Sequence, residues 1–98
     1  MSSPKVSVVI PVYNVENFLR LCLDSVKCQT LVDIEIICVD DGSTDSSGAI
    51  LDEYAGNDPR FVVIHKENGG YGKAMNMGLN HASGKYFCIL EVIWITWI

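Results

Sequence analysis

The chain has 98 residues, enough for one small domain, and its 49% apolar and 19% charged residues are typical of a folded globular protein rather than a disordered one. Its net charge of -5 argues against a general binder of nucleic acid or of anionic membranes, because both need a basic surface.

Four cysteines, Cys22, Cys28, Cys38 and Cys88, stand in apolar patterns, and no two of them form a CxxC pair. This placement favours core thiols of a protein in a reducing compartment over metal ligands or disulfides. The first five residues lead directly into an apolar run that is too short for the core of a secretory signal peptide. The sequence therefore predicts a cytoplasmic protein.

Apolar runs and helical periodicities alternate along the chain. The run 6–10 predicts a strand buried on both faces of a parallel sheet, and Pro11 is expected to end it. Apolar residues at helical spacing from Phe18 to Val26 predict a helix with Asn14 as its N-cap. Further elements are expected at 34–39 (strand), about 45–55 (helix, capped by Ser43 or Thr44), 61–64 (strand), 73–82 (helix) and 86–90 (strand).

This alternation with short connections predicts an α/β fold of Rossmann-like type, with three layers, α/β/α, around a mainly parallel four-stranded sheet. On the third helix Ala74, Gly78 and Ala82 form a stripe of small residues that lets the helix approach the sheet closely. Ligands of such sheets bind beyond the carboxyl ends of the strands. The loops 11–14, 40–45 and 66–73 are therefore expected to meet there.

The same loops exclude the familiar nucleotide sites. Residues 11–14 read Pro-Val-Tyr-Asn where a dinucleotide-binding fold has GxGxxG, and the chain contains no GxxxxGK[ST] motif. A phosphorylated receiver domain would have its acidic pair after the first strand, whereas here the pair follows the second.

Asp40 and Asp41 stand at the end of the apolar run 34–39. Two adjacent carboxylates in partly desolvated surroundings repel each other, which favours a ligand site. The alternative is a surface turn in which Asp45 serves the N-terminus of the next helix.

An aromatic ring, Tyr13, and a cation, Lys73, are expected near the two carboxylates. A ring for stacking and a carboxylate that accepts N–H bonds suit a nucleobase or a ribose, and a lysine at a helix N-terminus suits a phosphate. Tyr13 as a loop aromatic and Lys73 as a solvated helix residue are the plainer alternatives. The joint placement of the loops favours a nucleotide site.

Four blocks, VSVVIPVYN at 6–14, VDDGSTD at 39–45, NGG at 68–70 and ASGKY at 82–86, resemble in this order the opening of family 2 glycosyltransferases. The resemblance covers residues 5–91. It implies the GT-A fold and transfer of a sugar from a nucleotide-diphosphate donor, commonly a UDP-sugar, to a glycan or lipid-linked acceptor, with Mg²⁺ or Mn²⁺ as cofactor. The nucleotide contacts that it implies are Pro11, Val12, Tyr13, Glu16, Asp40, Asp41 and Lys73.

The chain departs from the family after its fourth predicted strand. Members carry a short acidic motif there that holds the metal, but here Glu91 is followed by Val92-Ile93-Trp94, and Met75 replaces an arginine of many members. A single carboxylate is a poor Mg²⁺ or Mn²⁺ site. We therefore expect no metal site, no assignable catalytic residue and no turnover in this chain, which leaves a non-catalytic uridine-nucleotide-binding or interaction domain as the alternative function.

The sequence thus predicts a nucleotide-sugar-binding half at 1–91 and an apolar tail at 92–98 that is foreign to the family, as a reading-frame slip would produce. The apolar stretch at the end is too short to span a bilayer as a helix. It is β-prone and uncharged, so it predicts self-association. A full-length enzyme that builds a surface polysaccharide would act at the inner face of the membrane.

Overall fold

A computed structural model describes residues 6–28 and 33–92 of the chain. Strands and helices alternate strictly within these ranges, which confirms the predicted order of elements. The elements are β1 (Val6–Val12), α1 (Glu16–Lys27), β2 (Ile34–Asp41), α2 (Ser47–Asn57), β3 (Phe61–Lys66), α3 (Tyr71–His81) and β4 (Tyr86–Ile89).

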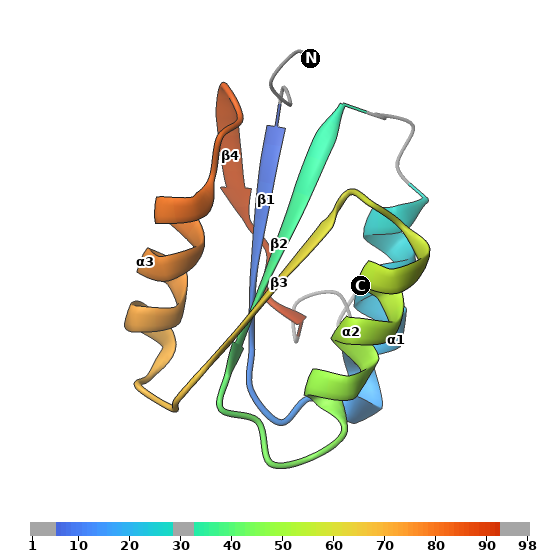
Figure 1. The fold of residues 1–98 in the computed structure, drawn as a ribbon, viewed down its shortest axis with the longest axis vertical. Helices are drawn as coiled ribbons and strands as arrows, with labels where there is room; N and C mark the ends of the chain where they lie inside the picture. Colours follow the sequence, from blue (N-terminus) through green and yellow to red (C-terminus); the bar gives the residue numbers. More distant parts are fainter. Residues whose placement is uncertain (1–5, 29–32, 93–98) are drawn as a thin grey trace.

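The four strands form one parallel sheet with the order β3-β2-β1-β4. Helices α1 and α2 cover one face of this sheet and α3 covers the other, so the three-layer α/β/α prediction is confirmed (Figure 1). The loops that follow β1, β2 and β3 all lie at the same end of the sheet, at the bottom of Figure 1. This is the end at which the sequence predicts a ligand site.

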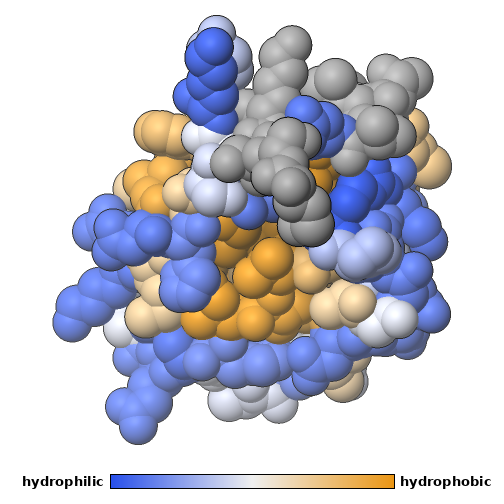
Figure 2. All heavy atoms as spheres, turned by 45° about the horizontal axis from the view of Figure 1, so that its top comes forward, coloured by the Kyte–Doolittle hydropathy of each residue, from blue (hydrophilic) through white to orange (hydrophobic). Residues whose placement is uncertain are grey.

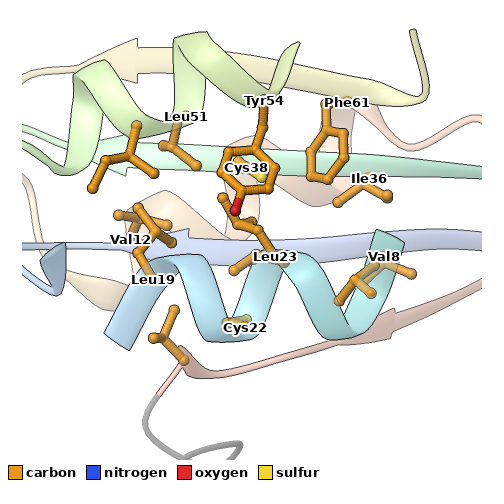
Figure 3. Packing of buried hydrophobic residues seen from close by; sticks show 14 of the residues in the cluster. Val8, Val12, Leu19, Cys22, Leu23, Ile36, Cys38, Leu51, Tyr54 and Phe61 are labelled. Carbon is orange, nitrogen blue, oxygen red and sulfur yellow. The ribbon is translucent and has the colours of Figure 1, made fainter. Parts of the chain in front are cut away.

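The larger core lies between the sheet and helices α1 and α2 (Figure 3). Leu19 and Leu23 of α1 and Leu51 of α2 are fully buried against strand residues such as Ile36. Burying a side chain of this size contributes about 1.5–3 kcal/mol. This cluster therefore fixes both helices, and with them the loops at their N-termini.

The opposite face packs more tightly because α3 presents small residues to it. Ala74 is fully buried, and a Cβ placed on Gly78 would overlap the Val9 side chain and lie 3.2 Å from Val39 Cγ2. Ala82 packs against the same smaller core. The predicted close approach of this helix to the sheet is confirmed.

Strand β1 continues to Val12, two residues beyond the predicted end. The carbonyl of Val9 accepts a hydrogen bond from the N–H of Leu90, the residue that follows β4. Pro11 lies two residues after Val9, so its backbone groups point to the same side of β1, toward β4. The β1–β4 pairing ends at Val9, so the missing N–H of Pro11 removes no ladder hydrogen bond. The strand can therefore run through the proline, paired with β2 alone.

The four thiols are free, and they divide into two groups. Cys22 and Cys38 are buried, as predicted, and burial raises the pKa of the Cys22 thiol to about 11. Cys28 and Cys88 are exposed, so the prediction of core thiols is wrong for them. Cys28 follows the last turn of α1, and Cys88 lies on β4, where every residue is exposed.

β3 and β4 form the two edges of the sheet. Figure 2 shows apolar side chains gathered in the middle of the face that carries β3, with a row of hydrophilic residues below them, and Val62 of this strand is 37% exposed. On β4 the exposed apolar residues are larger: Tyr86 is 57% and Phe87 61% exposed.

No helix in the ranges 6–28 and 33–92 is long and apolar enough to cross a membrane. Of the predicted tail, residues 93–98 lie outside the described ranges. Val92, its first residue, is 3% exposed and packs into the larger core.

Candidate functional site

A hollow of about 320 Å³ lies at the end of the sheet where β1 and β2 finish and α3 begins. Its lining consists of Pro11, Val12, Tyr13, Asp41, Asn68, Gly70, Tyr71 and Ala74. The first four of these are predicted site residues. The other four come from the glycine-rich loop and the start of α3. The sequence indicates this region because the loop follows a predicted strand, at the end of the sheet where ligands bind.

Asp41 is the charged residue of this hollow and is only 4% exposed. Its Oδ1 accepts hydrogen bonds from Lys66 Nζ at 2.7 Å and from the Gly69 N–H at 2.9 Å, and its Oδ2 accepts one from the Gly70 N–H at 3.0 Å. Burial by itself raises the pKa of Asp41, but these hydrogen bonds outweigh it and hold the pKa below the usual range. The carboxylate is therefore ionised at neutral pH.

The Asp41 carboxylate keeps room for one more hydrogen bond. An ionised carboxylate offers roughly four acceptor positions. Two bonds end on Oδ1 and one on Oδ2 within the described part of the chain. Because Asp41 lines the hollow, its carboxylate can accept an N–H from a ligand there.

Two tyrosines, Tyr13 and Tyr71, form the aromatic part of the lining, and each is 49% exposed. The hydroxyl of Tyr71 donates to Glu91 Oε1 at 2.8 Å, and this hydrogen bond, with burial, raises the pKa of Tyr71. A second hollow of about 120 Å³ contains Glu91 and shares Pro11 and Tyr71 with the first. Tyr71 is thus a common wall between the two.

Asp40 lies on the other face of the sheet and does not line the hollow. β2 extends through Asp41, and successive side chains of a strand point to opposite faces. The Oδ1 of Asp40 accepts the Ser43 N–H at 2.9 Å, and its Oδ2 lies 2.8 Å from His65 Nδ1. The structure therefore separates the acidic pair, and Asp40 holds the turn after β2.

His65 connects Asp40 to helix α2. Its Nε2 lies 2.8 Å from Asp52 Oδ1. Only the imidazolium form can donate from both ring nitrogens. The hydrogen bonds to Asp52 and then Asp40 raise the pKa of His65. Gly48 leaves room for this cluster, since a Cβ there would lie 2.8 Å from Asp40 Oδ2.

Asn14 does not cap its own helix, so that prediction is wrong. The N-cap of α1 is Val15, and Asn14 has a left-handed backbone with φ 49°. This conformation turns its side chain toward the loop after β2, where Oδ1 accepts the Thr44 N–H at 2.7 Å. In return, the Val15 N–H donates to Ser47 Oγ at 3.0 Å.

Glu16 also takes part in the hydrogen bonds that join the N-termini of α1 and α2, and it does not line the hollow. Its Oε2 accepts the Ser46 N–H at 3.2 Å, and its own N–H donates to Asp45 Oδ2 at 3.2 Å. Asp45 Oδ1 also accepts the Ser47 N–H at 2.8 Å, which confirms the interpretation that Asp45 serves this helix N-terminus. The N-cap position is Ser46, so the predicted caps from the preceding serine and threonine are wrong.

Lys73 is exposed in the first turn of α3 and does not line the hollow. A Cβ on Gly69 would lie 3.0 Å from both Lys66 Nζ and Lys73 Cδ, so the two lysine side chains flank the loop at Gly69. The ammonium group of Lys66 lies beside the Asp41 carboxylate, with its Nζ 2.7 Å from Oδ1.

The donor set does not fit a Mg²⁺ or Mn²⁺ ion. Within the described ranges, no group of three or more His, Cys, Asp and Glu residues is placed to hold a metal. Glu91 is the only acidic residue that lines the second hollow, and such ions are usually held by carboxylates together with substrate phosphates.

Solved glycosyltransferases have the same arrangement of strands and helices. The mannosyltransferase PcManGT from Pyrobaculum calidifontis, in complex with GDP-Man and Mn²⁺, superposes with a TM-score of 0.83 at 27% identity over 94% of this chain and 28% of its own. Staphylococcus aureus TarS, in complex with UDP-GlcNAc, gives a TM-score of 0.82 at 33% identity over 90% of this chain and 26% of its own. The fold is that of the GT-A glycosyltransferases.

The family model "Glycosyl transferase family 2" matches residues 7–92, and the chain belongs to this family. The glycosyltransferase GlyA of Streptococcus pneumoniae is 51% identical over 89% of this chain, and the uncharacterised glycosyltransferase EpsJ of Bacillus subtilis is 52% identical over 90%. The chain spans 12% of the length of GlyA and 26% of that of EpsJ.

Proposed function

We propose that this chain is the donor-nucleotide half of a family 2 glycosyltransferase and that the larger hollow binds the nucleoside of a nucleotide-diphosphate sugar, a UDP-sugar in particular. The observation that carries the proposal is the Asp41 carboxylate, ionised and buried, with one acceptor position left at a hollow that also contains Tyr13. The relatives and structural neighbours that are glycosyltransferases support it, among them TarS in complex with UDP-GlcNAc.

The chemistry of the carboxylate favours uracil among the pyrimidines. Uracil presents a ring N–H between two carbonyl groups, whereas the corresponding cytosine nitrogen is an acceptor and would face the Asp41 charge unpaired. The volume of about 320 Å³ is at the small end of ligand sites and suits a pyrimidine better than a purine. Tyr13, half exposed at the rim, supplies a ring on which the base can stack.

The remaining predicted contacts take two different roles in this proposal. Asp40 and Glu16 act as positioning residues, because they hold the turn after β2 and the start of α2. Lys73 stands free of the hollow in the first turn of α3, from which it can reach a diphosphate that leaves the nucleoside pocket.

For the 98 residues by themselves we propose nucleotide binding without sugar transfer. Transfer needs a base for the acceptor and stabilisation of the leaving diphosphate. Glu91 is the last acidic residue of the sequence, and Tyr71 already bonds to its carboxylate. Among the described residues that line the second hollow, Glu91 is the one carboxylate.

A calorimetric comparison of UDP with CDP tests the proposal. We expect UDP to bind at least about tenfold more tightly, since a buried acceptor left unpaired is costly. In Asp41→Asn the new amide can donate as well as accept, so the preference should disappear while the circular dichroism spectrum stays unchanged. Equal affinities for UDP and CDP in the unaltered chain, or an unchanged preference in Asp41→Asn, would contradict the assignment.

A further inference from the structure

Two ion pairs join the ends of β2 and β3, one on each face of the sheet. The register of these strands sets Asp40 opposite His65 and Asp41 opposite Lys66. Lys66 Nζ lies 2.7 Å from Asp41 Oδ1 beside the larger hollow. On the other face, His65 Nδ1 lies 2.8 Å from Asp40 Oδ2. Histidine is the residue type whose charge changes near neutral pH, so this second pair can respond to pH.

The Asp40 carboxylate is connected to the hollow through the turn at 42–45. Its Oδ1 accepts the Ser43 N–H at 2.9 Å. Ser43 Oγ in turn accepts the Asn14 N–H at 3.1 Å, and Asn14 directly follows Tyr13, which lines the hollow. The position of the Tyr13 loop therefore depends on how firmly Asp40 holds this turn.

The same turn lies against the glycine-rich loop. Gly42 has a left-handed backbone with φ 72°, and a Cβ on it would lie 2.6 Å from the backbone nitrogen of Asn68. Asn68 lines the hollow, and its Nδ2 donates to the Asp41 carbonyl at 3.1 Å. The turn after β2 thus contacts both loops that line the hollow, and a shift of the turn would displace both.

We propose that His65 is a positioning residue of the donor site, whose protonated ring favours nucleotide binding by holding this turn in place. The inference rests on the proposed function of the hollow. Only the imidazolium can donate to Asp40 and Asp52 at the same time, and the distances of 2.8 Å on both sides fit that form. Asp40 is thereby tied at once to the turn and, through the ring, to α2.

Loss of the proton breaks this arrangement. A neutral imidazole has one N–H, so one of the two carboxylates then faces a ring nitrogen that cannot donate. The Asp52 side chain is 63% exposed and can turn to water, whereas that of Asp40 is only 8% exposed. The bond that remains on Asp40 no longer joins two charges and is weaker. The turn is then held less firmly, and ordering it costs part of the binding energy.

Both charged groups that face His65 within the described ranges are acidic. Asp40 comes from β2 and Asp52 from α2, the two elements packed against β3. The next residue of α2, Glu53, pairs with Arg20 of α1 at 2.7 Å instead. The hydrogen bonds to Asp52 and then Asp40 raise the pKa of His65. Nucleotide affinity should be highest below this pKa and fall as the pH rises through it.

A comparison of UDP binding by the unaltered chain and by His65→Asn tests the proposal. Asparagine keeps an N–H near the position of Nδ1 but has no charge. UDP itself loses a phosphate proton near neutral pH, and comparing the two chains at the same pH removes that effect. We expect the dissociation constant of His65→Asn to be at least about fivefold higher at about pH 6 and nearly the same at about pH 8.5.

Two further variants provide controls. His65→Arg retains several donors and a charge that does not titrate, so it should bind UDP more tightly than His65→Asn at both pH values. His81, the other histidine of the sequence, is exposed on α3 and lines neither hollow. His81→Asn should therefore behave like the unaltered chain at each pH.

An NMR titration of the His65 ring needs no variant. Because linkage is reciprocal, saturation with UDP should move the titration midpoint of His65 to higher pH and leave that of His81 nearly in place. An unmoved His65 midpoint, or a His65→Asn chain that binds UDP as tightly as the unaltered one at about pH 6, would overturn the role of His65. An unaltered chain that binds no UDP at any pH would instead overturn the proposed function.

Discussion

Alternation along one strand gives two neighbouring carboxylates different tasks. Asp41 faces the hollow and ties the glycine-rich loop to β2, whereas Asp40 faces α2 and holds the turn that follows. The cost of burying the Asp41 charge is offset by Lys66 and two backbone N–H groups. In the proposed function this carboxylate recognises the base, and because it is held in place before any ligand arrives, the entropy cost of binding is lower.

Tyr13 is the residue whose removal tests stacking most cleanly, because its ring is half exposed. We expect Tyr13→Ala to weaken UDP binding by about 1–3 kcal/mol, the usual contribution of stacking between a base and an aromatic ring. Stability should hardly change. Phe18→Ala is the matched control, since Phe18 is 46% exposed on α1 and lines neither hollow, and it should bind UDP normally.

His65 gives the fold a pH-dependent contribution. Its pKa is raised in the folded chain, so protonated His65 stabilises the fold fully below its unfolded pKa of about 6.5, and this contribution is lost as the pH rises through the folded pKa. His65→Gln should therefore destabilise the chain more at about pH 6 than at about pH 9. Urea unfolding at the two pH values measures this, and an equal loss at both would refute the charged bridge.

At the level of elements, close packing of α3 brings the glycine-rich loop against β2. Gly78→Ala places a methyl group against Val9, and this overlap should lower the free energy of unfolding by about 1–3 kcal/mol. The higher helix propensity of alanine offsets roughly 1 kcal/mol of that loss. Gly72→Ala on the same helix meets no atom within 4 Å and should be neutral or slightly stabilising. Equal stability of the two variants in urea would show that α3 lies farther from the sheet.

The order of elements and the end of the sheet that carries the site follow from the sequence because apolar runs and helical periodicity are local signals. The faces are harder to predict. Because β2 extends to Asp41, the side chains of Asp40 and Asp41 point to opposite faces of the sheet, and Asp40 does not line the hollow. This extension depends on pairing with His65 and Lys66 of β3, which lie far along the chain. The left-handed backbone of Asn14 depends in the same way on a loop about thirty residues away.

As a whole molecule the chain has a hollow that we propose binds a nucleoside, and within the described ranges no group of three or more His, Cys, Asp and Glu residues is placed to hold a metal. We expect Mn²⁺ to change the dissociation constant of UDP by less than about twofold, because one carboxylate does not hold the ion. No UDP should be released from UDP-sugars over prolonged incubation. Strongly Mn²⁺-dependent binding, or UDP release above the level of a heat-denatured control, would show that the chain completes the site by another route.

The central claim, that a uridine nucleotide binds at the end of β1 and β2, is tested most directly by ¹H–¹⁵N NMR spectra recorded during a titration with UDP. We expect saturable shifts that are largest for the amides of Tyr13, Asp41, Gly70 and Tyr71, which all line the larger hollow. Unchanged spectra at these positions, or larger shifts at His65 and α2 on the opposite face, would contradict the claim.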